Sequence, residues 1–332
     1  MNDSTRQHCS EALSAVFIVA LSAISLVALF GNSLVVITFF KNKNLRTSSN
    51  YYIVNMAASD VLCSYCNWLV YSTESMLTGR RWISHDPLAS FLCKIGMYLR
   101  GTSQIVSVLS LVLIAVDRYF AIVFPLKTTI MDQERVRFTF LVLTWIIAGA
   151  FCCPGIRYTK VVQIGSDSFC RLFWNESAYT IFHSIAIVVL YFIPLAMIFF
   201  LYYRILRALR HRPISKNGLR DLRNISLRQH RQVIKMLISI VIAFFFCWTP
   251  LCIYFALKMF QRNLFLEDKC HIIVVLFFYV FPSLSTAFNP LILFLFSTNY
   301  RQALSNLRSK LFFVGNRRIS QSHVTALELY FR

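Results

Sequence analysis

Charged side chains are scarce in this chain of 332 residues. Asp, Glu, Lys and Arg make up 14% of it, whereas hydrophobic residues make up 57% and the mean hydropathy is +0.59. A soluble domain holds roughly 25% charged residues. The composition therefore argues against a soluble fold and favours a membrane protein with several spans.

Catalytic and metal-binding groups are also missing from the apolar part of the chain. No two carboxylates pair there, and Cys63 and Cys66 have no His or Cys nearby to complete a zinc site. We therefore expect no enzyme. A transporter is the alternative of another class, but apart from Asp60 and Arg100 few polar residues could line a path, and no inverted repeat occurs.

Seven stretches are apolar and long enough to cross a bilayer as helices. They cover residues 12–40, 50–71, 91–124, 136–153, 177–203, 232–257 and 271–296. The first is longer than the core of a signal peptide and shows no cleavage site with small residues, so we expect it to remain as a span. The sequence predicts an all-α membrane protein: an arm at 1–11, a seven-helix bundle at 12–296, and an amphipathic helix with a cytoplasmic tail at 297–332.

Basic residues lie almost entirely on one side of this layout. With the N-terminus outside the cell, the outer segments hold nine Lys or Arg against eight Asp or Glu, and the inner segments hold 23 against five. This asymmetry follows the positive-inside rule. Topology and anionic lipid at the inner leaflet thus explain the net charge of +20, and we expect no nucleic-acid partner.

Sequons agree with this orientation. Those at Asn2 and Asn175 fall outside, where we expect glycans, whereas the sequon at Asn224 falls inside and should stay unmodified.

The triplet Asp117-Arg118-Tyr119 stands where charge is costly. It follows a run from residue 95 to 116 whose only charged member is Arg100. An ion pair at the edge of a bilayer-length apolar helix indicates a switch rather than a packing contact.

Each span contains a sequence motif, and together these motifs resemble those of the rhodopsin-like family of G-protein-coupled receptors. The resemblance covers roughly residues 31–311 and implies a receptor that passes agonist binding outside to a heterotrimeric G protein inside. The motifs are Gly31-Asn32, Asp60, Cys93, Asp117-Arg118-Tyr119, Trp145, Pro194, Tyr202, Phe244, Cys247-Trp248-Thr249-Pro250 and Asn289-Pro290.

Asp60 is a carboxylate in the middle of a span. The resemblance implies a sodium-ion pocket at Asp60 with Ser107 and Asn289 as polar neighbours and Asn32 close by. A lone acid held neutral by hydrogen bonds is the alternative. Ser285 stands where many family members have Asn, which removes one group from the pocket.

The resemblance also implies an activation relay. Phe244 and Trp248 are four residues apart and share a helix face, and Pro250 should kink that helix. The ring of Trp248 would lie at the floor of the ligand pocket. The remaining members of the relay are Pro194, Val108 and Pro290.

The expected G-protein switch consists of Asp117, Arg118, Tyr119 and Tyr202. Leu293 stands where the family usually has Tyr, so it offers Tyr202 no hydroxyl. Residues 228–231 contain no acid that could hold Arg118. We therefore expect only the local pair of Asp117 and Arg118.

Ten cysteines are present. The resemblance implies a disulfide between Cys93 and Cys170 on the oxidising outer side. Cys9 and Cys270 also lie outside; they would either form a second disulfide or remain free thiols.

Arg100 narrows the class of ligand. Receptors for biogenic amines have an Asp at this place, and light-sensing relatives need a Lys in span seven, which residues 271–296 lack. We therefore expect neither an amine ligand nor retinal. Arg100 would bind a carboxylate or carbonyl, with Gln104 and Trp248 as further contacts, unless Arg100 snorkels or pairs internally.

Residues 98–103 and 233–237 look most like those of neuropeptide receptors. We therefore expect an extracellular peptide ligand and a place in the plasma membrane, with a small acidic or lipid ligand as the alternative. A receptor kinase and arrestin are expected partners of the tail, at Ser305, Ser309, Ser320, Ser322 and Thr325.

Overall fold

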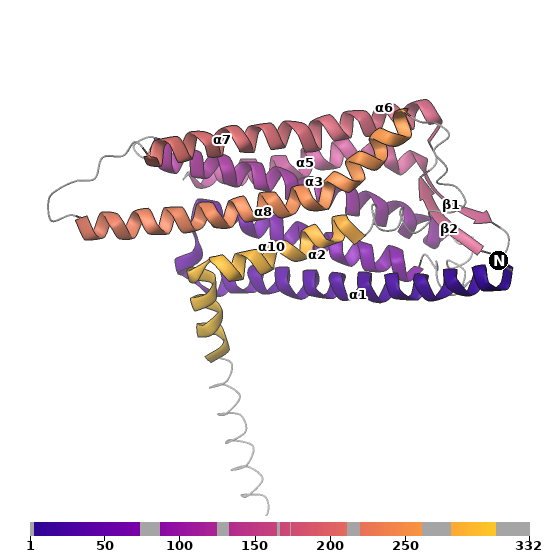
Figure 1. The fold of residues 1–332 in the computed structure, drawn as a ribbon, viewed down its shortest axis with the longest axis horizontal. Coiled ribbons are helices and arrows are strands. Elements are labelled where there is room, and N and C mark those ends of the chain that lie inside the picture. Colours follow the sequence, from indigo (N-terminus) through magenta and orange to yellow (C-terminus); the bar gives the residue numbers. More distant parts are fainter. Residues whose placement is uncertain are drawn as a thin grey trace, which may run out of the picture.

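A computed structural model supplies the fold. It describes residues 3–73, 87–124, 133–164, 167–172, 174–210, 220–260 and 280–309. Long helices lie side by side in one bundle, and the N-terminus lies at the same end as a small hairpin (Figure 1). The helices are α1 (Asp3–Lys41), the short η1 (Lys43–Leu45), α2 (Ser48–Thr73), α3 (Pro87–Val123), α5 (Glu134–Tyr158), α6 (Glu176–Ile187), the π-helical η2 (Val188–Phe192), α7 (Ile193–Arg210), α8 (Arg220–Phe260) and α10 (Phe281–Phe296).

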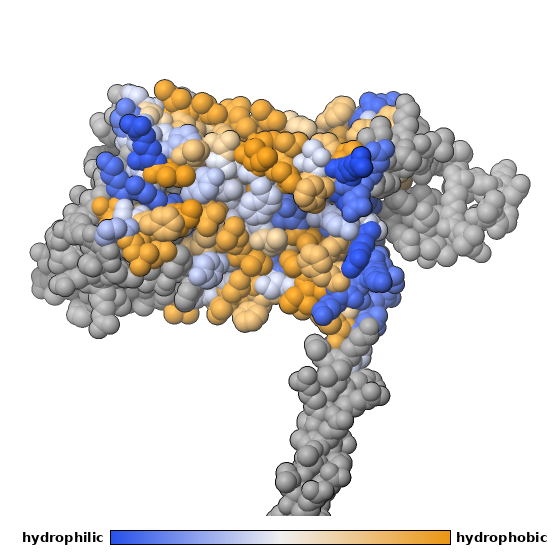
Figure 2. All heavy atoms as spheres, turned by 180° about the vertical axis from the view of Figure 1, so that it is seen from behind, coloured by the Kyte–Doolittle hydropathy of each residue, from blue (hydrophilic) through white to orange (hydrophobic). Residues whose placement is uncertain are grey.

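The described helices fit a multi-span membrane protein. Five of them are long and apolar enough to cross a bilayer, or six if α10 and the helix after it count as one broken span. α2 misses this test because polar side chains such as Asn55, Asp60 and Asn67 interrupt it. Hydrophobic side chains cover much of the middle of the visible face, between hydrophilic ones at both ends (Figure 2).

The first helix extends beyond the predicted span. α1 is helical from Asp3 and so includes most of the predicted arm at residues 1–11. Residues 3–15 contain no Pro or Gly, so nothing in the backbone stops the helix from extending beyond its apolar part. That apolar part begins at Val19.

An amphipathic helix follows the last span. Thr298–Ser309 turns by 89° from α10, and Figure 1 shows it leaving the bundle. Tyr300 and Ala303 are buried on one side of it, while Arg301 and Asn306 are exposed.

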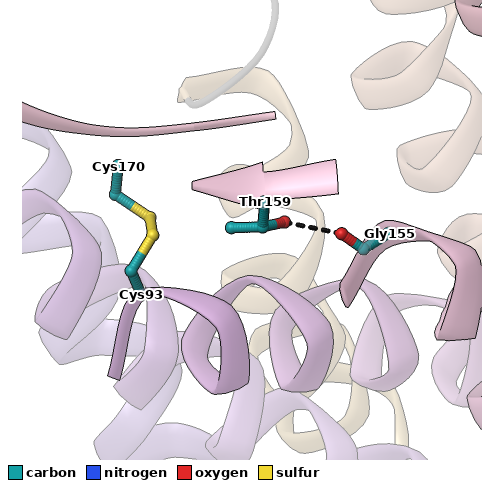
Figure 3. The surroundings of a disulfide bond; sticks show 4 residues. All are labelled: Cys93, Gly155, Thr159 and Cys170. Carbon is teal, nitrogen blue, oxygen red and sulfur yellow. Dashed lines mark hydrogen bonds between the residues drawn. A yellow bond between two sulfur atoms is a disulfide. The ribbon is translucent and has the colours of Figure 1, made fainter. Parts of the chain in front are cut away.

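A hairpin, which the sequence analysis did not predict, covers the outer end. β1 (Thr159–Ile164) pairs antiparallel with β2 (Asp167–Leu172), and only Gly165 and Ser166 separate them in the sequence. Two such residues between β-rich runs are a hairpin signal. The expected disulfide joins Cys93 at the start of α3 to Cys170 in β2 (Figure 3). It ties the hairpin to the bundle.

Polar side chains fasten the helices to one another. Asn55 of α2 donates to Ser110 in α3 (2.8 Å) and accepts from the Trp145 indole in α5 (3.0 Å). Asn32 of α1 donates to the carbonyl of Thr286 in α10 (3.0 Å). Inside a membrane, where burial of apolar surface does not drive helices together, such bonds and close packing of small residues hold a bundle.

Gly31 allows α1 and α10 to pack closely, because it has no side chain to separate them. A Cβ on Gly31 would lie 2.7 Å from Pro290 Cγ and 2.9 Å from Pro290 Cβ. The Pro290 ring cannot swing away as a flexible side chain could. Any larger residue would therefore push the two helices apart.

Replacing Gly31 with Ala should lower the free energy of unfolding by about 1–3 kcal/mol, the usual cost of overpacking. Thermal unfolding of the detergent-solubilised protein would measure it. Gly155→Ala is the control, because a Cβ there meets nothing closer than Leu172 Cδ1 at 4.0 Å. Equal melting temperatures for the two variants would contradict the packing argument.

Candidate functional site

An apolar cavity of about 190 Å³ lies between α3, α5, α6, η2 and α8. Aromatic rings supply a large part of its wall, and Trp248 and Phe244 of α8 are among them. The ring-bearing residues of the lining are Phe151, Phe182, His183, Tyr191, Phe244, Trp248 and Phe255.

Gln104 and Trp248, two of the three predicted ligand contacts, line this cavity together. The Gln104 carboxamide has no hydrogen-bond partner within the described part of the chain. Arg100, one turn along α3, is not among the lining residues. Its charge acts on the thiols of Cys63 and Cys66, so it faces α2.

Three residues of the predicted relay, Phe244, Trp248 and Val108, line the cavity, whereas Pro290 packs against Gly31 of α1. The rings of Phe244 and Trp248 stack with centroids 5.7 Å apart, as their spacing of four residues suggested. Val108 of α3 and Pro194 of α7 are buried in the same region. α8 continues through Pro250 and is bent in its later part (Figure 1).

Asp60 is fully buried in α2, with 0% of its side chain exposed. Its Oδ2 accepts a hydrogen bond from Asn289 of α10 (2.7 Å), the Ser107 side chain of α3 also interacts with it, and its Oδ1 has no partner. A buried carboxylate oxygen without a partner needs a proton or a cation. The residues present therefore fit a sodium ion held by Asp60 with the hydroxyl oxygen of Ser107.

Asn289 and Asn32 connect the helices around Asp60 through their amide nitrogens. The Asn289 amide donates to Asp60, and the Asn32 amide donates to the carbonyls of Ala28 and Thr286. Ser285 is buried beside them in α10.

Asp117 and Arg118 form an ion pair at the inner end of α3. Arg118 donates to Asp117 Oδ2 through Nη2 (2.8 Å) and Nε (3.2 Å). Ser49 of α2 donates to the same oxygen. This is the one ion pair found among the described residues. The side chains of residues 228–231, where no acid was expected to hold Arg118, lie outside them.

Ser49 is a member of the switch that the sequence analysis missed. Nothing in the sequence alone marks this Ser, because its role depends on how α2 packs against α3. The bond matters because it gives Asp117, which is 5% exposed, a third donor besides the two from Arg118.

Tyr202 of α7 is buried close to Arg118, whose charge acts on it. The Tyr202 hydroxyl has no hydrogen-bond partner, and Leu293 of α10 is buried without a hydroxyl to offer. Tyr119 is partly buried against the core of the bundle, and its ring contacts those of Phe120 and Phe124.

A second cavity, of about 280 Å³, opens at the inner end. α2, α3, α8, α10 and the start of the amphipathic helix line it, with Arg118 in its wall. Gln232 of α8 closes one side by donating to the carbonyl of Phe296 at the end of α10 (2.8 Å). Nothing in the sequence marks this Gln, because the contact depends on how α8 packs against α10.

The other predicted sites divide between the described and undescribed parts. Asn175 is exposed and caps α6 by accepting from the Ala178 amide (2.8 Å). Ser305 and Ser309 lie exposed on the amphipathic helix. Outside the described residues fall Asn2, Cys270, the side chain of Cys9, Ser320, Ser322 and Thr325.

Comparison with known proteins gives a consistent picture. A family model described as 7 transmembrane receptor (rhodopsin family) matches residues 31–293. The QRFP-like peptide receptor of Branchiostoma floridae is 30% identical over 285 residues, which cover 82% of this chain and 72% of that protein. The neuropeptide Y receptor type 2 of Homo sapiens is 30% identical over 302 residues (88% and 75%). The neuropeptide FF receptor 2 of Rattus norvegicus is 26% identical over 316 residues (89% and 72%).

Replacing Asp60 with Asn should remove any sodium dependence of stability. An ion that binds only the folded protein raises its stability, so the wild type should melt at a higher temperature in sodium chloride than in choline chloride of equal ionic strength. The Asp60→Asn variant should melt equally in both. Ser59→Ala, which removes a hydroxyl bonded within α2 to Met56, should keep the difference. A wild type insensitive to sodium would contradict the ion site.

Proposed function

This chain belongs to the rhodopsin family of seven-transmembrane receptors, and we propose that it binds an extracellular peptide at the plasma membrane and activates a heterotrimeric G protein. It is a multi-pass membrane protein of a receptor family, not an enzyme. The relatives compared above are named as peptide or neuropeptide receptors at 26–30% identity. Identities of this size support a peptide as the class of ligand but do not identify the amino-acid sequence of that peptide.

The outer cavity is the observation that carries the peptide proposal. An apolar cavity of about 150 Å³ takes up one benzene ring, so this cavity of about 190 Å³ has room for one large apolar side chain. The unpartnered carboxamide of Gln104 can bond to a backbone amide beside that side chain. A ring-sized apolar group next to an amide is what a peptide residue presents.

Arg100 extends the proposed site across α3. It lies four residues before Gln104, about 6 Å along the helix axis, and faces α2 rather than the cavity. A carbonyl or carboxylate of the ligand would bind there with a charge-assisted hydrogen bond. The ligand would therefore contact both sides of α3.

Signalling follows from differential binding. A ligand that contacts Trp248 and Gln104 more favourably in one arrangement of α8 shifts the population toward that arrangement. The stacked rings of Trp248 and Phe244 carry the displacement along α8. Pro250 lowers the resistance to bending, because it lacks a backbone donor.

The inner end supplies the output. Arg118 lines the inner cavity and is paired with Asp117. Gln232 connects α8 to α10 through its hydrogen bond to the Phe296 carbonyl. An outward movement of α8 would break the Gln232 contact and widen the cavity for a segment of the G protein. Ser305 and Ser309 are exposed nearby, where a receptor kinase could act before arrestin binds.

A collection of peptides applied to cells that express the chain should contain members that evoke G-protein dissociation. With an active peptide, Gln104→Ala should reduce potency about tenfold, the value of one hydrogen bond of roughly 1.4 kcal/mol. Ser103→Ala is the control and should keep full potency, since the Ser103 hydroxyl bonds only to the Leu99 carbonyl in its own helix.

The proposal of a peptide receptor fails if no peptide evokes a response at normal surface expression. If acidic metabolites or lipids evoke it instead, the receptor stands and the peptide is wrong. Unchanged potency of Gln104→Ala would place the peptide outside the cavity.

A further inference from the structure

Tyr191 links the outer cavity to the bend of α8. It belongs to η2, the π-helical turn just before Pro194, and its ring lines the cavity together with Trp248. Its hydroxyl lies 2.7 Å from Thr249 Oγ1 in α8. One side chain thus touches the proposed ligand space and the residue that precedes Pro250.

The direction of this hydrogen bond can be worked out. Thr249 Oγ1 also lies 2.6 Å from the carbonyl of Phe245. A carbonyl only accepts, so the single hydroxyl proton of Thr249 goes to Phe245. Tyr191 must therefore be the donor and Thr249 the acceptor.

The turn η2 is the reason that Tyr191 reaches α8. A Pro at position 194 has a ring that crowds the carbonyl four residues earlier and offers no backbone donor. A π-helical turn is one way for a helix to accommodate this, and such turns recur at functional sites. The ring of Tyr191 is then fixed edge-on against Phe245 (5.2 Å between centroids).

The bond acts at the weakest point of α8. Pro250 already removes one backbone hydrogen bond of the helix, and a Thr hydroxyl that bonds to the carbonyl four residues earlier favours bending. α8 packs broadly against α10 and only sparsely against α6, η2 and α7, which together form the fifth predicted span. A single hydrogen bond from Tyr191 therefore has a large influence on where α8 lies relative to span five.

We propose that the bond from Tyr191 to Thr249 is a latch that holds α8 in its closed position and that the ligand opens it. Tyr191 is a positioning residue in this account, because it acts on α8 through Thr249. The inference rests on the proposed function for its output. In the structure the latch occurs together with the Asp117–Arg118 pair and the contact of Gln232 with Phe296, so it belongs to the closed arrangement.

An apolar group that enters the cavity beside Tyr191 would displace its ring and separate the two hydroxyls. Ligand binding would then remove a restraint at Thr249 at the same time as it presses on Trp248. Both effects favour movement of the same part of α8.

The test is a double-mutant cycle. Tyr191→Phe and Thr249→Val each remove one hydroxyl while keeping the shape of the side chain. Each should raise agonist-independent G-protein activation about three- to tenfold, the range for one hydrogen bond. The double variant should show no more activity than the single ones, since both remove the same bond.

Two controls separate the latch from a general loss of structure. Thr249→Ser keeps the hydroxyl and should restore wild-type basal activity. Tyr203→Phe removes a hydroxyl from an exposed Tyr of α7 and should change nothing.

A second readout does not depend on the G protein. A fluorescent label on Lys235→Cys, an exposed position in the inner half of α8, should report a shifted environment in Tyr191→Phe without ligand. A change in label fluorescence without any G-protein activation would support the latch but contradict the proposed function. An unchanged label together with unchanged basal activity, or additive effects of the two substitutions, would overturn the latch.

Discussion

A membrane interior offers no water to a buried polar group, and this constraint organises the whole bundle. Every buried hydroxyl, amide and carboxylate must find a partner on a neighbouring helix or be left at a cost. Asn55, Asn32 and Asn289 satisfy the constraint by joining helices. Asp60 Oδ1, Gln104 and the Tyr202 hydroxyl do not satisfy it. Thr38 Oγ1 and the Tyr300 hydroxyl also lack a partner. For Asp60, Gln104 and Tyr202 we propose that an ion, a ligand or a second arrangement of the helices supplies one.

The proposed functional residues of α3 follow one another along the helix from its outer to its inner end. Gln104 and Val108 line the outer cavity, Ser107 reaches Asp60, and Arg118, near the inner end of the helix, lines the inner cavity. Gln104 and Arg118 are 14 residues apart, about 21 Å along the axis. α8 is the element that can move relative to α3, because Pro250 weakens its later part and its contacts with α6, η2 and α7 are sparse.

The sequence predicted what depends on local pattern or on spacing along one helix. The apolar runs predicted the helices, and the interval of four residues predicted the stack of Phe244 on Trp248. What it could not predict depends on register between helices. The Ser49 contact with Asp117, the Gln232 contact with Phe296 and the Tyr191 contact with Thr249 arise from packing. The helical conformation of the arm from Asp3 onward was not assigned from the sequence, because its polar residues show no apolar pattern.

The central claim is that ligand binding in the outer cavity moves the inner end of α8. Spin labels on Lys235→Cys in α8 and Phe138→Cys in α5, both exposed positions, would measure the distance directly. A saturating peptide agonist should lengthen the main distance by several ångströms and leave a minor population at the resting value. An unchanged distance distribution in protein that still activates its G protein would contradict the account.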